Sequence, residues 1–117
     1  MNDTDLLPPE LAKKSLSPLE IVLPYVEVLE AIEHLAAKGY LVFAWEGWLK
    51  YPDGRHTHSI HQGTRGFWGT KGQSAQERIQ ETATFARQTI KESQQEWDEK
   101  PEIAGGTLCF CLSIEAV

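Results

Sequence analysis

Two short pairs of histidine and cysteine are the residues of this chain best suited to metal chemistry. His56 and His58 stand two positions apart, and so do Cys109 and Cys111. Side chains two positions apart on a β-strand point to the same side, so two such pairs could offer two nitrogens and two sulfurs to a tetrahedral zinc ion. The spacing matches no known zinc module, and buried thiols with hydrogen-bonded histidines are the simpler interpretation. We therefore expect no cofactor, with zinc at these four residues as the alternative.

The same residues bear on catalysis. A thiol beside an imidazole on one face of a sheet could make an activated nucleophile, and Glu46 could act there as an acid or a base. No pattern in the sequence fixes a third, orienting group or an oxyanion site. The sequence therefore favours a non-enzymatic function but leaves catalysis open. A small ligand- or metal-binding enzyme that uses His56, His58 and the Gly-rich loop 62–73 is kept as an alternative.

A segment without carboxylates separates Asp53 from Glu77, although the chain has 17 Asp and Glu and a net charge of −6. The segment holds three of the four histidines and the cations Arg55, Arg65 and Lys71. A Gly-rich backbone and the N-terminus of a following helix can bind an anion. The loop lacks the known phosphate-binding patterns, so a small anion at 62–73 is one interpretation and an ordinary surface loop is the other.

Aromatic side chains in and near this loop indicate a binding surface. Phe67 and Trp68 are adjacent, and two large aromatic residues in a polar loop either pack on the body of the protein or engage a partner. Trp48 precedes the loop, on the strand face that we expect to point away from the helices. The predicted binding surface consists of Trp48, His56, His58, Arg65, Phe67, Trp68 and Lys71.

Helix signals occur twice along the chain. Ser17 and Glu20 form a capping box that predicts a helix over 17–38, within which Pro24 predicts a kink or two abutting helices. Ser74 and Glu77 form a second capping box, followed by apolar residues at helical spacing as far as Trp97.

Strand signals occupy the remaining segments. Residues 40–51 and 55–61 read as two strands of a hairpin, and 107–115 alternates as a third strand. The turn Pro52-Asp53-Gly54 suits a three-residue hairpin loop with Gly54 in the left-handed region. In this register Lys50 lies opposite His56, Trp48 opposite His58 and Glu46 opposite Ile60, while His61 points inward beside Trp45. Alternation places Leu41, Phe43, Trp45 and Leu49 toward the helices, and Tyr40, Val42, Ala44, Glu46, Trp48 and Lys50 on the outer face.

The order α-β-β-α-β predicts an α+β fold, a two-layer α/β sandwich in which two helices pack on one face of a small mixed sheet. The helix after the hairpin would connect strands two and three, which we expect to run parallel. Residues 1–16 are polar and contain Pro8-Pro9, so they predict a flexible N-terminal arm, with 17–117 as a single domain.

Composition limits the function. The net charge of −6 makes nucleic acid an unfavourable partner, and no apolar run approaches the length of a membrane span. Two cysteines and an acidic start favour the cytoplasm. We predict a protein-interaction or regulatory module that acts as a homodimer. The alternative from composition is an acidic, immunity-type inhibitor of a basic toxin or nuclease.

Overall fold

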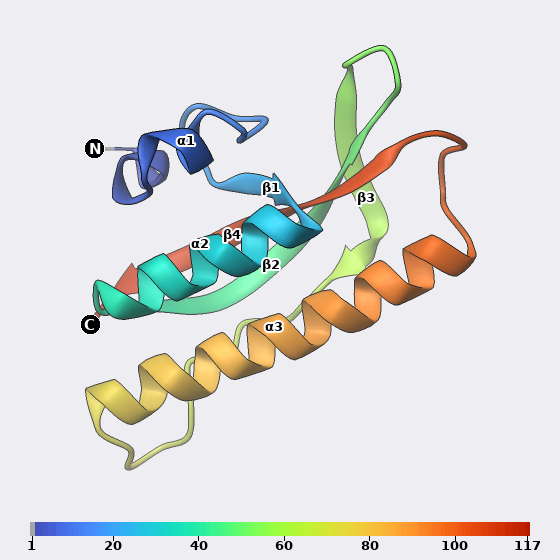
Figure 1. Cartoon of the computed structure of the whole chain (residues 1–117). Coiled ribbons are helices and arrows are strands. Elements are labelled where there is room, and N and C mark those ends of the chain that lie inside the picture. The colour runs from blue at the N-terminus through green and yellow to red at the C-terminus, as the bar shows by residue number, and fades with distance from the viewer. Residues whose placement is uncertain (1) are drawn as a thin grey trace.

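The computed structural model describes residues 2–117, and its centre is one four-stranded sheet in the order β1-β4-β2-β3 (Figure 1). The elements are η1 (Asp3–Leu6), α1 (Pro9–Ala12), β1 (Val22–Pro24), α2 (Tyr25–Ala37), β2 (Tyr40–Lys50), β3 (His56–Gly63), α3 (Ala75–Glu99) and β4 (Thr107–Ala116). No helix within residues 2–117 has both the length and the apolar character needed to cross a membrane.

The predicted α+β architecture is confirmed, with α2 and α3 covering one face of the sheet (Figure 1). Ile32 of α2 and Ile90 of α3 are fully buried in one cluster with Phe110 of β4. All neighbouring strands are antiparallel, so the prediction of a mixed sheet is wrong. The strands on either side of α3, β3 and β4, do run in the same direction, but β2 lies between them.

The first helix begins later than its capping signal predicts. The Ser17 hydroxyl accepts bonds from the backbone N–H groups of Leu19 and Glu20, both at 3.2 Å, but this turn does not continue as a helix. The chain instead forms β1, which pairs with β4, and α2 starts directly after Pro24. Proline removes a backbone donor and disfavours helical geometry at the residue before it, so Pro24 ends the strand and begins the helix.

The N-terminal segment contributes to the core. Leu6, Leu7 and Leu11 are buried in the cluster beneath the helices, and the Lys38 ammonium donates to the Leu6 carbonyl. Leu16 packs on the opposite face of the sheet. The segment that we predicted to be an arm outside the domain therefore supplies side chains to both faces of the sheet.

A bulge in β2 reverses part of the predicted alternation. Val42 lies opposite Ile114 and Ala44 opposite Ser113, so Phe43 is an extra residue on this strand. A bulge shifts the side chains before it to the other face. Val42 consequently packs in the core with Trp45, whereas Phe43 stacks on Trp68 instead of facing the helices.

The hairpin turn follows the prediction. Gly54 has a φ of 94° and its N–H donates to the Tyr51 carbonyl at 3.0 Å, while the Tyr51 N–H donates to Arg55 at 2.8 Å. The predicted pairs Lys50–His56 and Trp48–His58 are both present. The local turn chemistry therefore sets the register of this end of the hairpin.

Further along β3 the register departs from the prediction, because residues 59–62 bulge. Glu46 lies opposite Gly63 and not Ile60. The Ser59 hydroxyl accepts bonds from the N–H groups of His61 and Gln62, each at 3.1 Å, which stabilises the bulge. His61 is exposed and does not point inward beside Trp45.

Candidate interaction surface

The outer face of the hairpin is built around Trp48. His56 and His58 lie against its ring, with centroid distances of 5.3 and 4.7 Å. The indole N–H donates to Glu46 Oε1 at 3.1 Å, and His58 Nδ1 lies 3.4 Å from the same oxygen. Trp48 is only 8% exposed as a result. The two histidines and Glu46, and not the tryptophan, form the accessible surface here.

The two thiols lie beside Trp48 on the same face and are buried with Val22. Burial raises the pKa of Cys109 to about 11. Burial also raises the pKa of Cys111, and its thiol donates to Glu20 Oε2 at 3.3 Å, which adds to the shift. Because the thiolate is the reactive form, neither residue is suited to nucleophilic chemistry near neutral pH.

The four predicted zinc ligands do not converge. His56 and His58 belong to β3 and the cysteines to β4, and β2 lies between these strands. Strands two places apart in a sheet are separated by about 10 Å. Trp48 fills the intervening position, since it pairs with His58 on one side and Cys109 on the other. Within residues 2–117 no three His, Cys, Asp or Glu side chains come close enough to hold a metal ion.

The loop after β3 uses its polar groups internally. The Thr70 N–H donates to Gln73 Oε1 at 2.8 Å, and the side chains of both residues donate to the Glu81 carboxylate. At the start of α3 the Glu77 carboxylate accepts from the Ser74 N–H, which lowers the pKa of Glu77. Two carboxylates of the chain therefore accept from the Thr70 and Gln73 side chains and from the Ser74 N–H, so these three donors do not serve an external anion. Arg65 and Lys71 remain exposed.

The adjacent aromatic residues of the loop pack on different layers. Trp68 stacks on Phe43 with ring centroids 4.7 Å apart, and Phe67 packs against Phe85 of α3 at 4.8 Å. The Phe67 N–H donates to the Phe43 carbonyl at 2.7 Å, and this backbone hydrogen bond attaches the loop to β2. Gly66 is required for this arrangement, because a Cβ there would lie 2.4 Å from the Trp68 ring.

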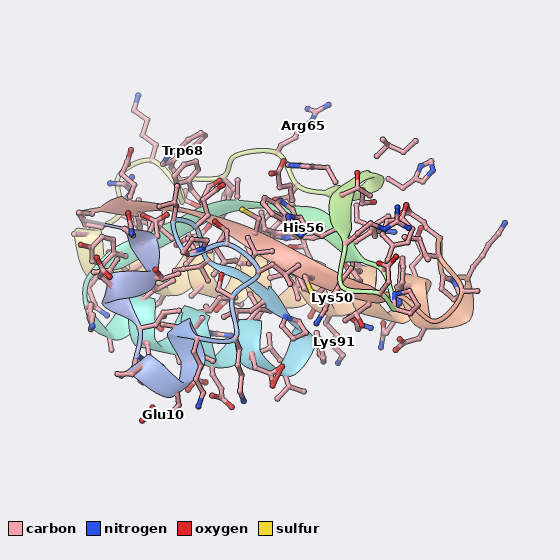
Figure 2. All side chains as sticks on the ribbon, turned by 90° about the horizontal axis from the view of Figure 1, so that it is seen from above. Glu10, Lys50, His56, Arg65, Trp68 and Lys91 are labelled. Carbon is pink, nitrogen blue, oxygen red and sulfur yellow. The ribbon has the colours of Figure 1, made fainter. Side chains whose placement is uncertain are left out.

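These four aromatic residues, Phe43, Phe67, Trp68 and Phe85, form what we call the aromatic end. Trp68 is 44% exposed and Phe85 is 42% exposed. Phe67 and Phe85 also line an open, mainly apolar cavity of about 600 Å³ between the loop and α3. Figure 2 shows Trp68 and Arg65 on the same side of the molecule, along the loop that follows β3.

The predicted binding surface thus divides into two parts. Trp48, His56 and His58 cluster at one part of the hairpin. Trp68 stacks on Phe43 elsewhere on β2, and Phe67 packs against Phe85 of α3. Five positions along a strand correspond to about 16 Å, which is the spacing between Trp48 and Phe43. The prediction missed Phe43, because of the β2 bulge, and Phe85.

Phe85 did have a signal in the sequence. It lies beside the small residues Ala83 and Ala86, which face the core, and is therefore a large apolar residue off the buried stripe of α3. Such a residue on a helix surface indicates a contact with another segment or another molecule.

Comparison with protein-family models, with curated proteins and with solved structures finds no match to this chain.

Proposed function

We propose that the protein is a non-enzymatic protein-interaction module that acts as a homodimer joined through the aromatic end. The observation that carries this proposal is the partial exposure of two aromatic side chains of the aromatic end, Trp68 of the loop and Phe85 of α3. Large aromatic residues are enriched at the centres of interfaces, and an exposed group of them is unfavourable in a monomer.

The charges around the aromatic end suit a second copy of the same chain. The loop and the first turns of α3 carry the cations Arg65 and Lys71 and the carboxylates Glu77 and Glu81. A two-fold interface brings one patch against an identical patch. A patch with both signs of charge can then pair cations of one protomer with carboxylates of its partner.

An enzymatic function has less support. Cys109 and Cys111 are buried and resist ionisation, and Trp48 separates them from the histidines. A catalytic arrangement needs a nucleophile and a base within hydrogen-bonding reach. The Glu46, His58 and Trp48 contacts instead stabilise the hairpin.

The test is the oligomeric state of matched variants, measured by native mass spectrometry and sedimentation over a range of protein concentrations. We expect a dimer for the unchanged protein and a monomer for Phe85→Glu, which places a charge in the aromatic end. Val26→Glu is the control, because Val26 is an apolar residue of α2 that is 61% exposed. A monomer at every concentration, or equal effects of the two substitutions, would contradict the proposal.

A further inference from the structure

The C-terminal end of α3 holds an unusual concentration of negative charge. Residues 92–102 contain five carboxylates and one lysine, a local net charge of −4. The carbonyl end of a helix is itself negative, so cations are the favoured residues there. The last turn of α3 contains no basic residue. This arrangement opposes helix stability, and such a local cost is expected where a sequence serves binding.

Most of these carboxylates accept hydrogen bonds from neutral side chains. In the part of the chain that the structure describes, none of the five belongs to an ion pair. Four of them accept hydrogen bonds from Gln or Ser side chains, in the pairs Gln88–Glu92, Gln62–Glu96, Gln94–Asp98 and Ser59–Glu102. Their negative charge therefore remains available to an external cation.

An open pocket adjoins this acidic end. It has a volume of about 600 Å³ and lies between the bulge of β3 and the end of α3. Ile60 and Pro101 supply apolar lining, and Glu96 and Glu102 supply carboxylates. The remaining lining residues are His61, Gln62 and Lys100. Ile60 is 87% exposed. Large apolar side chains this exposed beside a pocket are typical of interaction sites.

The pocket is held open by the bulge itself. Ser59 donates to Glu102 at 2.8 Å, and Gln62 is bound by the Ser93 hydroxyl and donates to Glu96. These bonds fix both walls and leave Ile60, between Ser59 and Gln62 in the sequence, directed into solvent. The site is therefore built from two segments that are about 40 positions apart in the sequence. The entropy cost of closing a loop rises only slowly with its length, so this separation is compatible with a stable site.

We propose that this pocket and the surrounding carboxylates bind a basic polypeptide segment of another protein. A lysine or arginine side chain can lay its aliphatic stem on Ile60 and Pro101 while its charged head reaches Glu96 and Glu102. The complementary charge selects a basic partner and speeds its association. This inference goes beyond the proposed homodimer, because Phe85 and Glu96 are about 16 Å apart along α3.

The probe is a short fluorescein-labelled peptide that alternates lysine and serine, with a glutamate–serine peptide as the charge control. Binding of each peptide to the protein is measured by fluorescence anisotropy at low salt and at about 0.15 M salt. The double variant Glu96→Gln, Glu102→Gln keeps the acceptors for Gln62 and Ser59, and we expect about tenfold weaker binding. The matched control is Glu30→Gln, Glu33→Gln, which removes the same charge from exposed positions of α2 and is expected to change affinity by less than about twofold.

A second variant separates docking from general attraction. Ile60→Ser leaves the charge unchanged, and we expect it to weaken peptide binding severalfold because the apolar wall of the pocket is lost. Equal losses in the two double variants, or wild-type affinity in Ile60→Ser, would overturn the inference. The Phe85→Glu protein is expected to bind the peptide like wild type, so failure of the homodimer and failure of this site give different results.

Discussion

Individual tryptophans of this protein have different roles that their residue type does not reveal. Trp48 is enclosed by two histidines, a glutamate and two thiols, whereas Trp68 covers Phe43 and remains half exposed. The cost of removing an aromatic side chain depends on how much of it is buried. The two residues therefore offer a direct comparison between a buried and a partly exposed tryptophan.

We expect Trp48→Ala to lower the free energy of unfolding by about 3–5 kcal/mol. Trp68→Ala removes one stacked contact and should cost only about 1 kcal/mol. Urea denaturation followed by circular dichroism measures both values. Equal losses would mean that the enclosed environment of Trp48 is not what stabilises the hairpin.

The thiols give a prediction that depends on pH. Because burial raises the pKa of Cys109 to about 11, we expect both cysteines to resist alkylation by iodoacetamide at neutral pH and to react after unfolding in urea. Folding holds these thiols protonated, so this contribution to stability is complete below the ordinary thiol pKa of 9.0 and is lost as the pH rises toward 11. Rapid labelling of the folded protein at pH 7 would contradict this expectation.

Among the elements, the β2–β3 hairpin depends on a close approach at its bulge. A Cβ at Gly47 would lie 2.8 Å from Cβ of Gln62 and 3.2 Å from Leu108. We expect Gly47→Ala to destabilise the protein by about 1–3 kcal/mol through overpacking. Gly63→Ala is the control, because its Cβ would meet nothing closer than 3.5 Å. Similar urea midpoints for the two variants would argue against this tight contact.

The start of α3 depends on its capping box. Ser74 accepts from the Glu77 N–H at 3.1 Å, and Ser74→Ala should cost about 0.5–2 kcal/mol. Folding lowers the pKa of Glu77, so its stabilising effect is present above the ordinary carboxyl value of 4.5 and is lost as the pH falls below it. Glu77→Gln should therefore lower the melting temperature at pH 7 and have little effect in acid. A difference that persists unchanged in acid would contradict the ionic role of Glu77.

Local chemistry in the sequence predicted the elements whose signals lie within a few residues. The Gly54 turn, the Ser74 cap and the alternation of side chains between the two faces of β4 all follow their patterns. The strand β1 and the two bulges could not be predicted in this way. They depend on pairing between distant segments, as in Val22 with Cys111, which local propensity does not encode. Only Pro24 indicated that the helix predicted over 17–38 was longer than the observed α2.

At the scale of the whole molecule, two surfaces lie toward opposite ends of α3. The aromatic end is next to the first half of the helix, and the acidic pocket is next to its last turn. Separate surfaces allow a homodimer and a basic partner to be accommodated together. A basic partner is also what the acidic composition of the chain led us to consider as an alternative.

The candidate surfaces could be predicted only in part. Arg65, Phe67 and Trp68 are close in sequence, and the loop keeps them together. Phe43 and Phe85 join them only through tertiary packing, and Ile60 becomes exposed because of a bulge that breaks the alternation of β3. The histidine and cysteine pairs, which the spacing suggested as zinc ligands, are separated by β2. The position of β2 between β3 and β4 was not predicted from the sequence.

The position of β4 has a consequence for how the protein is made. It is the last strand in chain order, yet it lies between β1 and β2 and pairs with both. During translation, β1 therefore has no neighbour in the sheet until residues 107–116 have left the ribosome. Until then β2 lacks its main neighbour in the sheet, and such exposed intermediates are prone to aggregate. The nascent chain is consequently expected to need protection by chaperones until its last strand emerges, and a ribosome-bound chain stalled before Thr107 should be sensitive to protease.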